Sequence, residues 1–268
     1  MKNAYLIIDV AQCNDCNNCF VACLDEHVAN EWPPYTGSAP RHGHRWMNIL
    51  RTERGQYPRI DVAFLPMPCQ HCQDAPCIKA HPDCFTRRPD GIVLIDAIKA
   101  HARKELMGSC PYGAIYWNED KQVCQKCTMC AHLLDNGDLK ETRCSHSCHT
   151  GAIRYLLLEP AEMEKLVKEE GLENYRSELG TRPNVYYKNL HRFTKAFITG
   201  AILRNGDCAE NVQVSLNGQG VNATQTTDYF GEFKFDALLP GVYRLEANGK
   251  QLAEVNLSSS VNLGEFTL

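Results

Sequence analysis

The sequence predicts an α+β protein made of two unlike parts, a cysteine-rich N-terminal part and a small antiparallel β-domain. The chain has 268 residues, which is more than the usual single domain. Of its fifteen cysteines, all but Cys208 precede residue 150. After about residue 197, short alternating segments are separated by Gly, Asn and Asp turns. We therefore expect a metal-binding domain at 1–158, a helix and extended linker arm at 159–196, and a β-domain at 197–268.

The cysteine-rich domain is expected to contain short strands between its ligand loops. YLIIDV at 5–10 and GIVLID at 91–96 are both short apolar segments that end in Asp, and the first leads directly into a cysteine loop. Such similarity between two segments of one chain is typical of a duplicated unit. The sequence thus suggests internal duplication of this domain.

A helix and an extended arm are predicted between the two domains. Pro160 stands where a helix begins and Gly171 where one ends, and the residues between them can share an apolar face. Pro183 interrupts any helix in the segment that follows, which is rich in Tyr, Arg and Lys. The sequence leaves open whether this arm lies on its own N-terminal domain or on a partner.

The C-terminal segments VQVSLNG at 212–218, FGEFKFDAL at 230–238 and GVYRLEANG at 241–249 alternate with a period of two. This periodicity predicts a small antiparallel β-sandwich or barrel. The order of turn glycines and strand aromatics around Gly231 and Phe233 resembles transthyretin-like or carboxypeptidase-regulatory-like modules. Cys208 stands alone in this domain and is expected to be a plain thiol.

The redox state of the cysteines follows from the compartment. The apolar run at the N-terminus is too short for an export signal, and no stretch has the roughly 18 apolar residues that a spanning helix needs. We therefore expect a soluble, cytoplasmic chain, although a folded subunit can also be exported with a signal-carrying partner. Reduced, dense cysteines indicate metal ligands rather than disulfides.

The first cysteine run is Cys13, Cys16, Cys19 and Cys23, with the spacing C-x2-C-x2-C-x3-C. In ferredoxins this spacing lets three thiolates bind one four-iron cubane while the fourth ligates another cluster. Zinc is the competing metal, but structural zinc sites usually pair two separated C-x2-C knuckles. The run therefore predicts a ferredoxin-like iron–sulfur domain.

The second run, Cys69, Cys72 and Cys77, stops one ligand short. Its spacing requires a fourth cysteine at position 81, which holds a histidine followed by proline. His81 could ligate iron, but the change also fits the loss of a ligand from a cluster that is absent.

A third run has lost all but its last cysteine. Cys110 precedes a proline, as the fourth cysteine of a ferredoxin motif does, but the three earlier positions hold Ala100, Arg103 and Leu106. This motif cannot hold a cluster of its own, so Cys110 is left to complete the cluster begun by the second run. One vacant cluster site then accounts for both defects.

The fourth group of cysteines is Cys127, Cys130, Cys144 and Cys148. By the crossing rule of ferredoxins, the last cysteine of one run ligates the cluster held by the other run, so this group is paired with the first run. Twelve cysteines thereby form three sets of iron ligands: Cys13, Cys16, Cys19 and Cys148 for cluster 1; Cys23, Cys127, Cys130 and Cys144 for cluster 2; and Cys69, Cys72, Cys77 and Cys110 for cluster 3. Cys84 is then expected to be a bystander, while Cys124 is close enough to Cys127 in sequence to compete with it as a ligand.

The charge of the chain disfavours a nucleic-acid partner. Its formal net charge is −4 with every cysteine neutral, and three four-iron clusters at about −2 each would bring it to roughly −10. A local basic stretch from Arg41 to Arg59 is interpreted as a solvated surface, with a docking face for an acidic partner as the alternative. Histidines near the ligand loops, among them His44, His71 and His132, are expected to pack or hydrogen-bond rather than to relay protons.

Residues 1–158 resemble the four-cluster ferredoxin-type subunits of molybdopterin oxidoreductases of the dimethyl sulfoxide reductase, polysulfide reductase and nitrate reductase type. The resemblance is carried by CNDCNNCF, CPYGAIYWNE and QKCTMCAHLLD. The missing cluster and the added β-domain are similar to small subunits of molybdenum enzymes that move a hydroxyl group between phenols. The resemblance implies a large catalytic partner that carries molybdenum bis-molybdopterin guanine dinucleotide, a heterodimer or a multiple of it, and no catalytic residue in this chain.

Two other functions stay open. One is an electron-transfer subunit of an anaerobic phenol hydroxylase or dehydroxylase of the resorcinol type, with net redox turnover. The other is a free-standing ferredoxin whose β-domain binds a scaffold. All three functions would use the same twelve ligands, so the spacing does not separate them.

Overall fold

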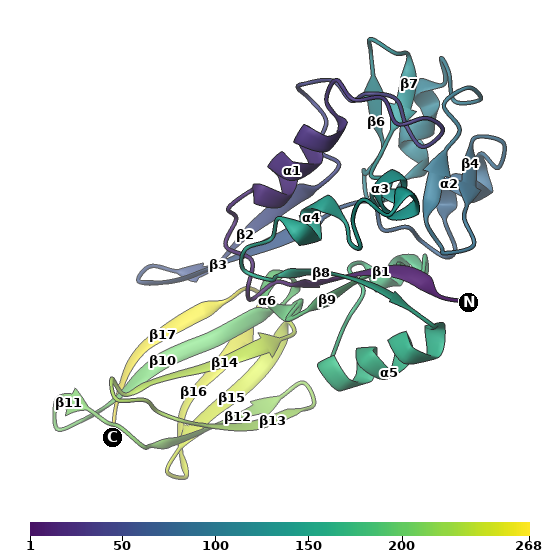
Figure 1. Ribbon diagram of the computed structural model, residues 1–268. Coiled ribbons are helices and arrows are strands. Elements are labelled where there is room, and N and C mark those ends of the chain that lie inside the picture. Colours follow the sequence, from purple (N-terminus) through teal and green to yellow (C-terminus); the bar gives the residue numbers. More distant parts are fainter. The chain divides into compact units, whose positions relative to one another are not determined.

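The computed structural model describes residues 1–268 and divides them into two compact units (Figure 1). Unit 1 comprises Met1–Leu50 and Phe64–Leu190, and unit 2 comprises Arg51–Ala63 and His191–Leu268. These bounds differ from the expected ones in two places. Residues 51–63 group with the β-domain, and most of the expected linker groups with the cysteine-rich unit.

Unit 1 contains a three-stranded sheet with β1 (Asn3–Asp9) at its centre. β1 pairs antiparallel with β8 (Ile153–Leu158) and parallel with β9 (Val185–Lys188). Its residues 4–8 are all buried. A strand covered on both faces requires such a continuous apolar run, which is why this segment does not alternate.

The predicted helix is confirmed as α5 (Pro160–Glu170). A capping box between Glu159 and Glu162 begins it, and Gly171 ends it in the left-handed conformation at φ 62°. Its Met163 belongs to the same buried cluster as Tyr5 of β1. The helix therefore covers the sheet of unit 1 instead of standing free as a linker.

The remaining elements of unit 1 are short, because cysteine loops interrupt them. They are the helices α1 (Asn18–His27), α2 (Pro76–Ala80), α3 (Ala131–Asn136) and α4 (Arg143–His146), the 3-10 helices η1 (Lys104–Ser109) and η2 (Ser177–Leu179), and the hairpins β4 (Phe85–Arg87) with β5 (Val93–Ile95) and β6 (Tyr116–Asn118) with β7 (Val123–Gln125). The echoing segments 5–10 and 91–96 have different strand partners. The internal duplication therefore stays a prediction.

The longest helix of the chain is α5, with 11 residues. A helix that spans a bilayer needs about 20 predominantly apolar residues. None of the helices qualifies as a membrane span.

Unit 2 is sheet-rich, as predicted, and its two four-stranded sheets share one core. One sheet contains β10 (Ala196–Arg204), β11 (Asp207–Cys208), β14 (Glu232–Leu238) and β17 (Val261–Thr267); the other contains β12 (Gln213–Gly218), β13 (Val221–Thr226), β15 (Gly241–Ala247) and β16 (Lys250–Leu257). Alternate residues of both sheets, such as Phe233, Phe235, Tyr243 and Leu245, are buried together. β17 pairs parallel with β10, so the unit is not wholly antiparallel.

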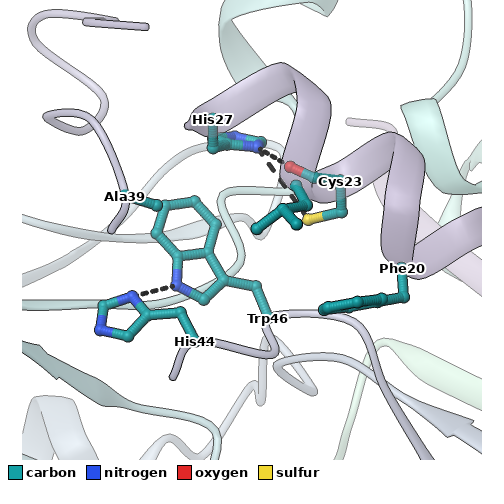
Figure 2. A pocket seen from close by; sticks show the side chains of 7 residues that line it. Phe20, Cys23, His27, Ala39, His44 and Trp46 are labelled. Atoms are coloured by element: carbon teal, nitrogen blue, oxygen red, sulfur yellow. Dashed lines mark hydrogen bonds between the residues drawn. The ribbon is translucent and has the colours of Figure 1, made fainter. Parts of the chain in front are cut away.

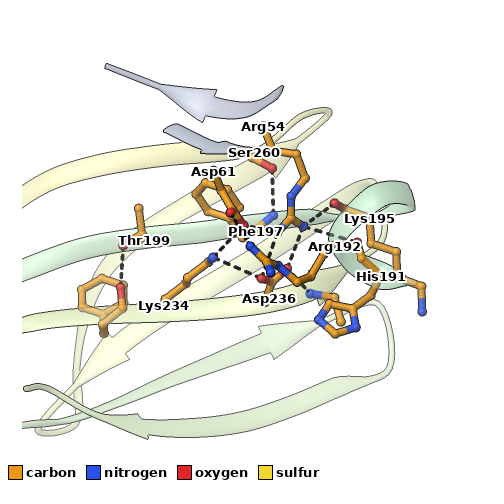
Figure 3. A network of polar contacts seen from close by, with 12 residues as sticks. Arg54, Asp61, His191, Arg192, Lys195, Phe197, Thr199, Lys234, Asp236 and Ser260 are labelled. Carbon is orange, nitrogen blue, oxygen red and sulfur yellow. Dashed lines mark hydrogen bonds and ion pairs between the residues drawn. The ribbon is translucent and has the colours of Figure 1, made fainter. Parts of the chain in front are cut away.

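A charged cluster explains why residues 51–63 group with unit 2. These residues belong to the hairpin of β2 (Asn48–Gln56) and β3 (Arg59–Met67). Figure 3 shows Arg54 directed at Asp61 and Asp236, to which it donates at 2.5 Å and 2.9 Å. Arg192 and Lys234 also pair with Asp61, at 2.8 Å and 3.2 Å. A buried guanidinium needs such partners.

The interpretation of the basic stretch as a solvated surface is wrong for Arg54, which is only 7% exposed. Arg59 pairs with Glu232 of unit 2. Arg45 lies over the ring of Phe20, 4.1 Å from its centroid. At these three positions the arginines have partners within their own units, which sequence spacing does not reveal.

Candidate iron–sulfur cluster sites

The structure brings together the four cysteines predicted for cluster 1. Cys13 and Cys16 lie in the loop after β1, Cys19 lies in the first turn of α1, and Cys148 follows α4. Burial raises the pKa of the Cys19 thiol to about 12, and the neighbouring Cys13 and Cys148 add to the rise. Cys16 is exposed, with its Sγ atom 3.6 Å from Nδ1 of His149. Cluster 1 is thus expected to have one solvent-accessible corner.

The cysteines predicted for cluster 2 also converge, and they are more deeply buried. Burial raises the pKa of Cys23 and Cys130 well above 9, that of Cys127 to about 12 and that of Cys144 to about 11. Cys127, Cys130 and Cys144 each add to the rise at Cys23. Backbone amides donate to two of the sulfurs, at 3.3 Å for Cys127 and 3.4 Å for Cys130. Such amides stabilise a thiolate once it forms.

The cysteines predicted for cluster 3 line a single small cavity. Cys77 lies on α2, Cys110 follows η1, and Cys69 and Cys72 lie in the loop before α2. Burial raises the pKa of Cys72 to about 12 and that of Cys77 to about 11, and Cys69 contributes to both shifts. The other lining residues are mostly apolar or aromatic.

Each set has the donor chemistry of a [4Fe-4S] cluster, which takes one cysteine thiolate at each of its four irons. All fifteen cysteines are free thiols. No group of three or more His, Cys, Asp or Glu side chains is arranged for a single metal ion. Cluster binding requires thiolates, so a bound cluster displaces the protons of its ligand thiols. The residues present therefore fit three clusters, and the assignment of each ligand stays a prediction.

The three cysteine sets lie next to one another, with the second set between the first and the third. Cys69 of the third set raises the pKa of Cys127 in the second. Cys19 of the first set raises the pKa of Cys144 in the second. The second set is therefore a neighbour of both others, an arrangement that suits stepwise electron transfer along a row.

Comparisons with known proteins agree with this chemistry. A family model described as a 4Fe-4S dicluster domain matches residues 60–156. The whole chain is 52% identical over 275 residues to the pyrogallol hydroxytransferase small subunit of Pelobacter acidigallici, with all of both chains covered. The chain belongs to the pyrogallol hydroxytransferase small-subunit family.

More distant relatives of this hydroxytransferase family member are also iron–sulfur subunits. A protein of Halobacterium salinarum, described as a dimethyl sulfoxide reductase iron–sulfur subunit, is 29% identical, over 70% of this chain and 80% of that one. The iron–sulfur cluster-binding subunit of menaquinone reductase from Nitratidesulfovibrio vulgaris is 28% identical, over 68% and 87%. The first of these relatives agrees with the predicted resemblance to dimethyl sulfoxide reductase-type subunits.

This member of the hydroxytransferase family fills its predicted vacant site with side chains. Ala100 and Leu106, which stand at two of the missing ligand positions, are fully buried in one apolar cluster with Cys84 and Cys124. Arg103, at the third, donates to Cys84 Sγ at 2.8 Å. Cys84 and Cys124 thus lie in a packed core, which fits the prediction that Cys84 is not a ligand and disfavours Cys124 as a competing one.

The arm after α5 lies on unit 1 itself, which answers the question left open by the sequence. Backbone amides of Gln73 and Asp74 donate to the carbonyls of Arg182 and Thr181, at 2.8 Å and 3.0 Å. The Tyr112 hydroxyl lies 2.7 Å from that of Thr181. Leu179 and Tyr175 pack against the apolar cluster that contains Cys72. The arm therefore covers the third cysteine set.

Histidines beside the second set have packing and hydrogen-bonding roles, as expected. Figure 2 shows His27 and Trp46 packed beside Cys23, with His44 bonded to Trp46. His27 is 2.8 Å from the Cys23 carbonyl, and burial lowers its pKa to about 4, so it is neutral. His44 donates from Nε2 to the Trp117 carbonyl at 2.9 Å, so its Nδ1 accepts from Trp46 at 3.3 Å. These bonds fix the rings in position.

One charged residue near the candidate sites was not singled out by sequence reasoning. Lys126 is buried and lines the cavity of the third set, together with His71. Its place directly before Cys127 offers no signal of burial, because lysines beside metal ligands are commonly exposed. Only the folded structure identifies it.

Proposed function

We propose that this chain holds three [4Fe-4S] clusters and exchanges electrons with the molybdopterin centre of a large catalytic subunit. The observation that carries the proposal is the grouping of twelve cysteines into three adjoining sets. When bound, each cluster supplies reversible uptake of one electron. The chain ligates the clusters, shields the second and third from water and holds all three in a row, and no residue in it is assigned to catalysis.

We infer that the partner transfers a hydroxyl group between phenols, from pyrogallol to phloroglucinol. Identity of 52% over the whole chain, β-domain included, supports this substrate class, since the relative is named for pyrogallol. The partner would carry molybdenum bis-molybdopterin guanine dinucleotide, in a heterodimer or a multiple of it. Because hydroxyl transfer is redox-neutral overall, the clusters would set or restore the oxidation state of molybdenum rather than carry a net current.

The exposure of the ligands suggests which end of the row meets the partner. Cys16 of the first set is exposed in the isolated chain, whereas the third set is covered by the arm. We therefore assign the cluster 1 end to the partner interface, because electron transfer requires close approach to one cluster.

Two finer assignments accompany this function. Unit 2 is proposed to be a transthyretin-like module, on its two sheets with one shared core and the Gly231–Phe233 pattern given above. A reducing compartment, the cytoplasm, suits a protein whose cysteines serve as cluster thiolates.

The proposal is tested on the complex purified without oxygen from its native source. Iron analysis should give about 12 irons per small chain from this subunit, and molybdenum should co-purify. The complex should convert pyrogallol to phloroglucinol with a tetrahydroxybenzene co-substrate and no electron acceptor. Activity that appears only with an external acceptor or donor would favour the phenol hydroxylase or dehydroxylase instead.

A further inference from the structure

We propose that Lys126 and His71 raise the reduction potential of the cluster bound by Cys69, Cys72, Cys77 and Cys110, and so favour residence of an electron at that end of the row. The inference rests on the proposed function and deepens it. Lys126 and His71 both line the cavity of the third cysteine set. Lys126 lacks a carboxylate partner, and Nε2 of His71 lacks a hydrogen-bond acceptor.

Lys126 is a buried ammonium without a carboxylate. It is only 3% exposed. Its Nζ atom donates to the Val93 carbonyl and, at 3.0 Å, to that of Cys127, and it takes part in none of the ion pairs. Two neutral carbonyls do not balance a buried charge, which is costly unless an anion lies nearby. The four thiolates and cluster of the adjoining cavity, at about −2, are such an anion.

His71 presents a buried N–H without an acceptor. Its Nδ1 atom accepts a hydrogen bond from the backbone amide of Val93 at 3.0 Å, so the ring proton lies on Nε2. That Nε2 atom is fully buried and has no hydrogen-bond partner. His71 stands between Cys69 and Cys72 and lines the same cavity. A sulfur atom of a bound cluster is the acceptor that this cavity would supply.

Both groups favour the reduced cluster over the oxidised one. Reduction adds one negative charge, which a nearby cation and an N–H donor stabilise. Low dielectric strengthens both effects. Lys126 already opposes the burial-driven rise in the pKa of Cys77 and Cys110. Lys126 also lowers the pKa of Cys127 in the second set, but there the carboxylate Glu26, a neighbour of Cys130, acts in the opposite direction.

The test is a redox titration of the intact complex, followed by electron paramagnetic resonance. Lys126→Gln keeps a donor but removes the charge, and Lys126→Arg keeps the charge. Lys79→Gln is the matched control, because Lys79 is an exposed lysine on α2, two residues from Cys77. We expect Lys126→Gln to lower the one-electron reduction constant of one cluster at least tenfold, about 59 mV. His71→Phe should act in the same direction, whereas Lys126→Arg and Lys79→Gln should stay within about twofold, which is about 18 mV on the same scale.

Iron analysis separates failure of this inference from failure of the proposed function. A parent complex without about 12 irons in this subunit contradicts the proposed function. Full iron in Lys126→Gln and His71→Phe with unshifted potentials overturns the tuning role alone. If both variants lose a cluster, the residues serve assembly, and the tuning role is likewise overturned.

Discussion

Arg103 donates a hydrogen bond from Nη1 to the Sγ atom of Cys84 at 2.8 Å, and it stands where a four-cluster pattern requires a cysteine. The same guanidinium lies 3.1 Å from Nδ1 of His81, which replaces another ligand. The residues at two of the predicted missing ligand positions thus contact each other. At the predicted vacant site, these hydrogen bonds lie beside the apolar cluster of Ala100 and Leu106.

Replacing Arg103 should therefore cost stability without costing iron. Arg103→Ala leaves Cys84 and His81 without their shared partner, and we expect a lower melting temperature. Thermal melting of the anaerobic complex and iron analysis check both parts. Loss of four irons in this variant would show that the site is not vacant.

Ligand and bystander cysteines should differ sharply in the same assay. Cys144→Ser removes a predicted cluster 2 ligand and should lower the iron content by about four atoms per chain. Cys124→Ser is the matched control, because Cys124 is equally buried but packs in the apolar cluster with Cys84. Equal iron loss in both variants would mean that Cys124 competes as a ligand.

The charged cluster around Arg54, Asp61 and Asp236 in unit 2 should stabilise the β2–β3 hairpin at all pH values near neutral. Burial alone raises the pKa of Asp61, but bonds from Arg54 and Arg192 and the charge of Lys234 outweigh it and lower the pKa to about 2. Because the unfolded value is near 3.8, this stability is fully present above that pH and is lost as pH falls through about 2.

Asp61→Asn should therefore lower stability by about 1–3 kcal/mol, since it leaves a largely buried arginine short of a partner. The difference in melting temperature from the parent should be constant between pH 5 and pH 8. A difference that changes steeply within that range would show that another group titrates in the cluster.

The arm should protect the third cluster from solutes. Tyr175→Ala removes a ring that packs against the apolar cluster around Cys72, so an iron chelator should extract iron faster. The initial rate of iron release under anaerobic conditions measures this. Tyr229→Ala, which changes a tyrosine that is 74% exposed in unit 2, should release iron at the parent rate.

The sequence predicted the features that depend on local spacing. The helix around Met163, the strands of unit 2 and the convergence of Cys13 with Cys148 all follow from periodicity or from the crossing rule. Each of these signals lies in the identity and spacing of a few neighbouring residues. Such signals are readable without knowledge of the tertiary contacts.

The features that depend on distant contacts were missed or left open. Arg54 looks like any surface arginine until Asp236, far along the chain, lies beside it. The residues around Thr181 do not indicate in sequence which surface the arm packs on. Lys126 is buried beside Val93, which lies 33 residues earlier in the chain. Sequence reasoning fails there because burial is a property of the whole fold.

Diffraction from crystals of the anaerobic complex at the iron absorption edge would locate the irons directly. We expect twelve iron peaks in this subunit, in three groups of four, each within bonding distance of one of the three cysteine sets. The three groups should form a row with the Cys23 set in the middle. A group of iron peaks beside His81 and Arg103, or fewer than three groups, would contradict the three-cluster assignment.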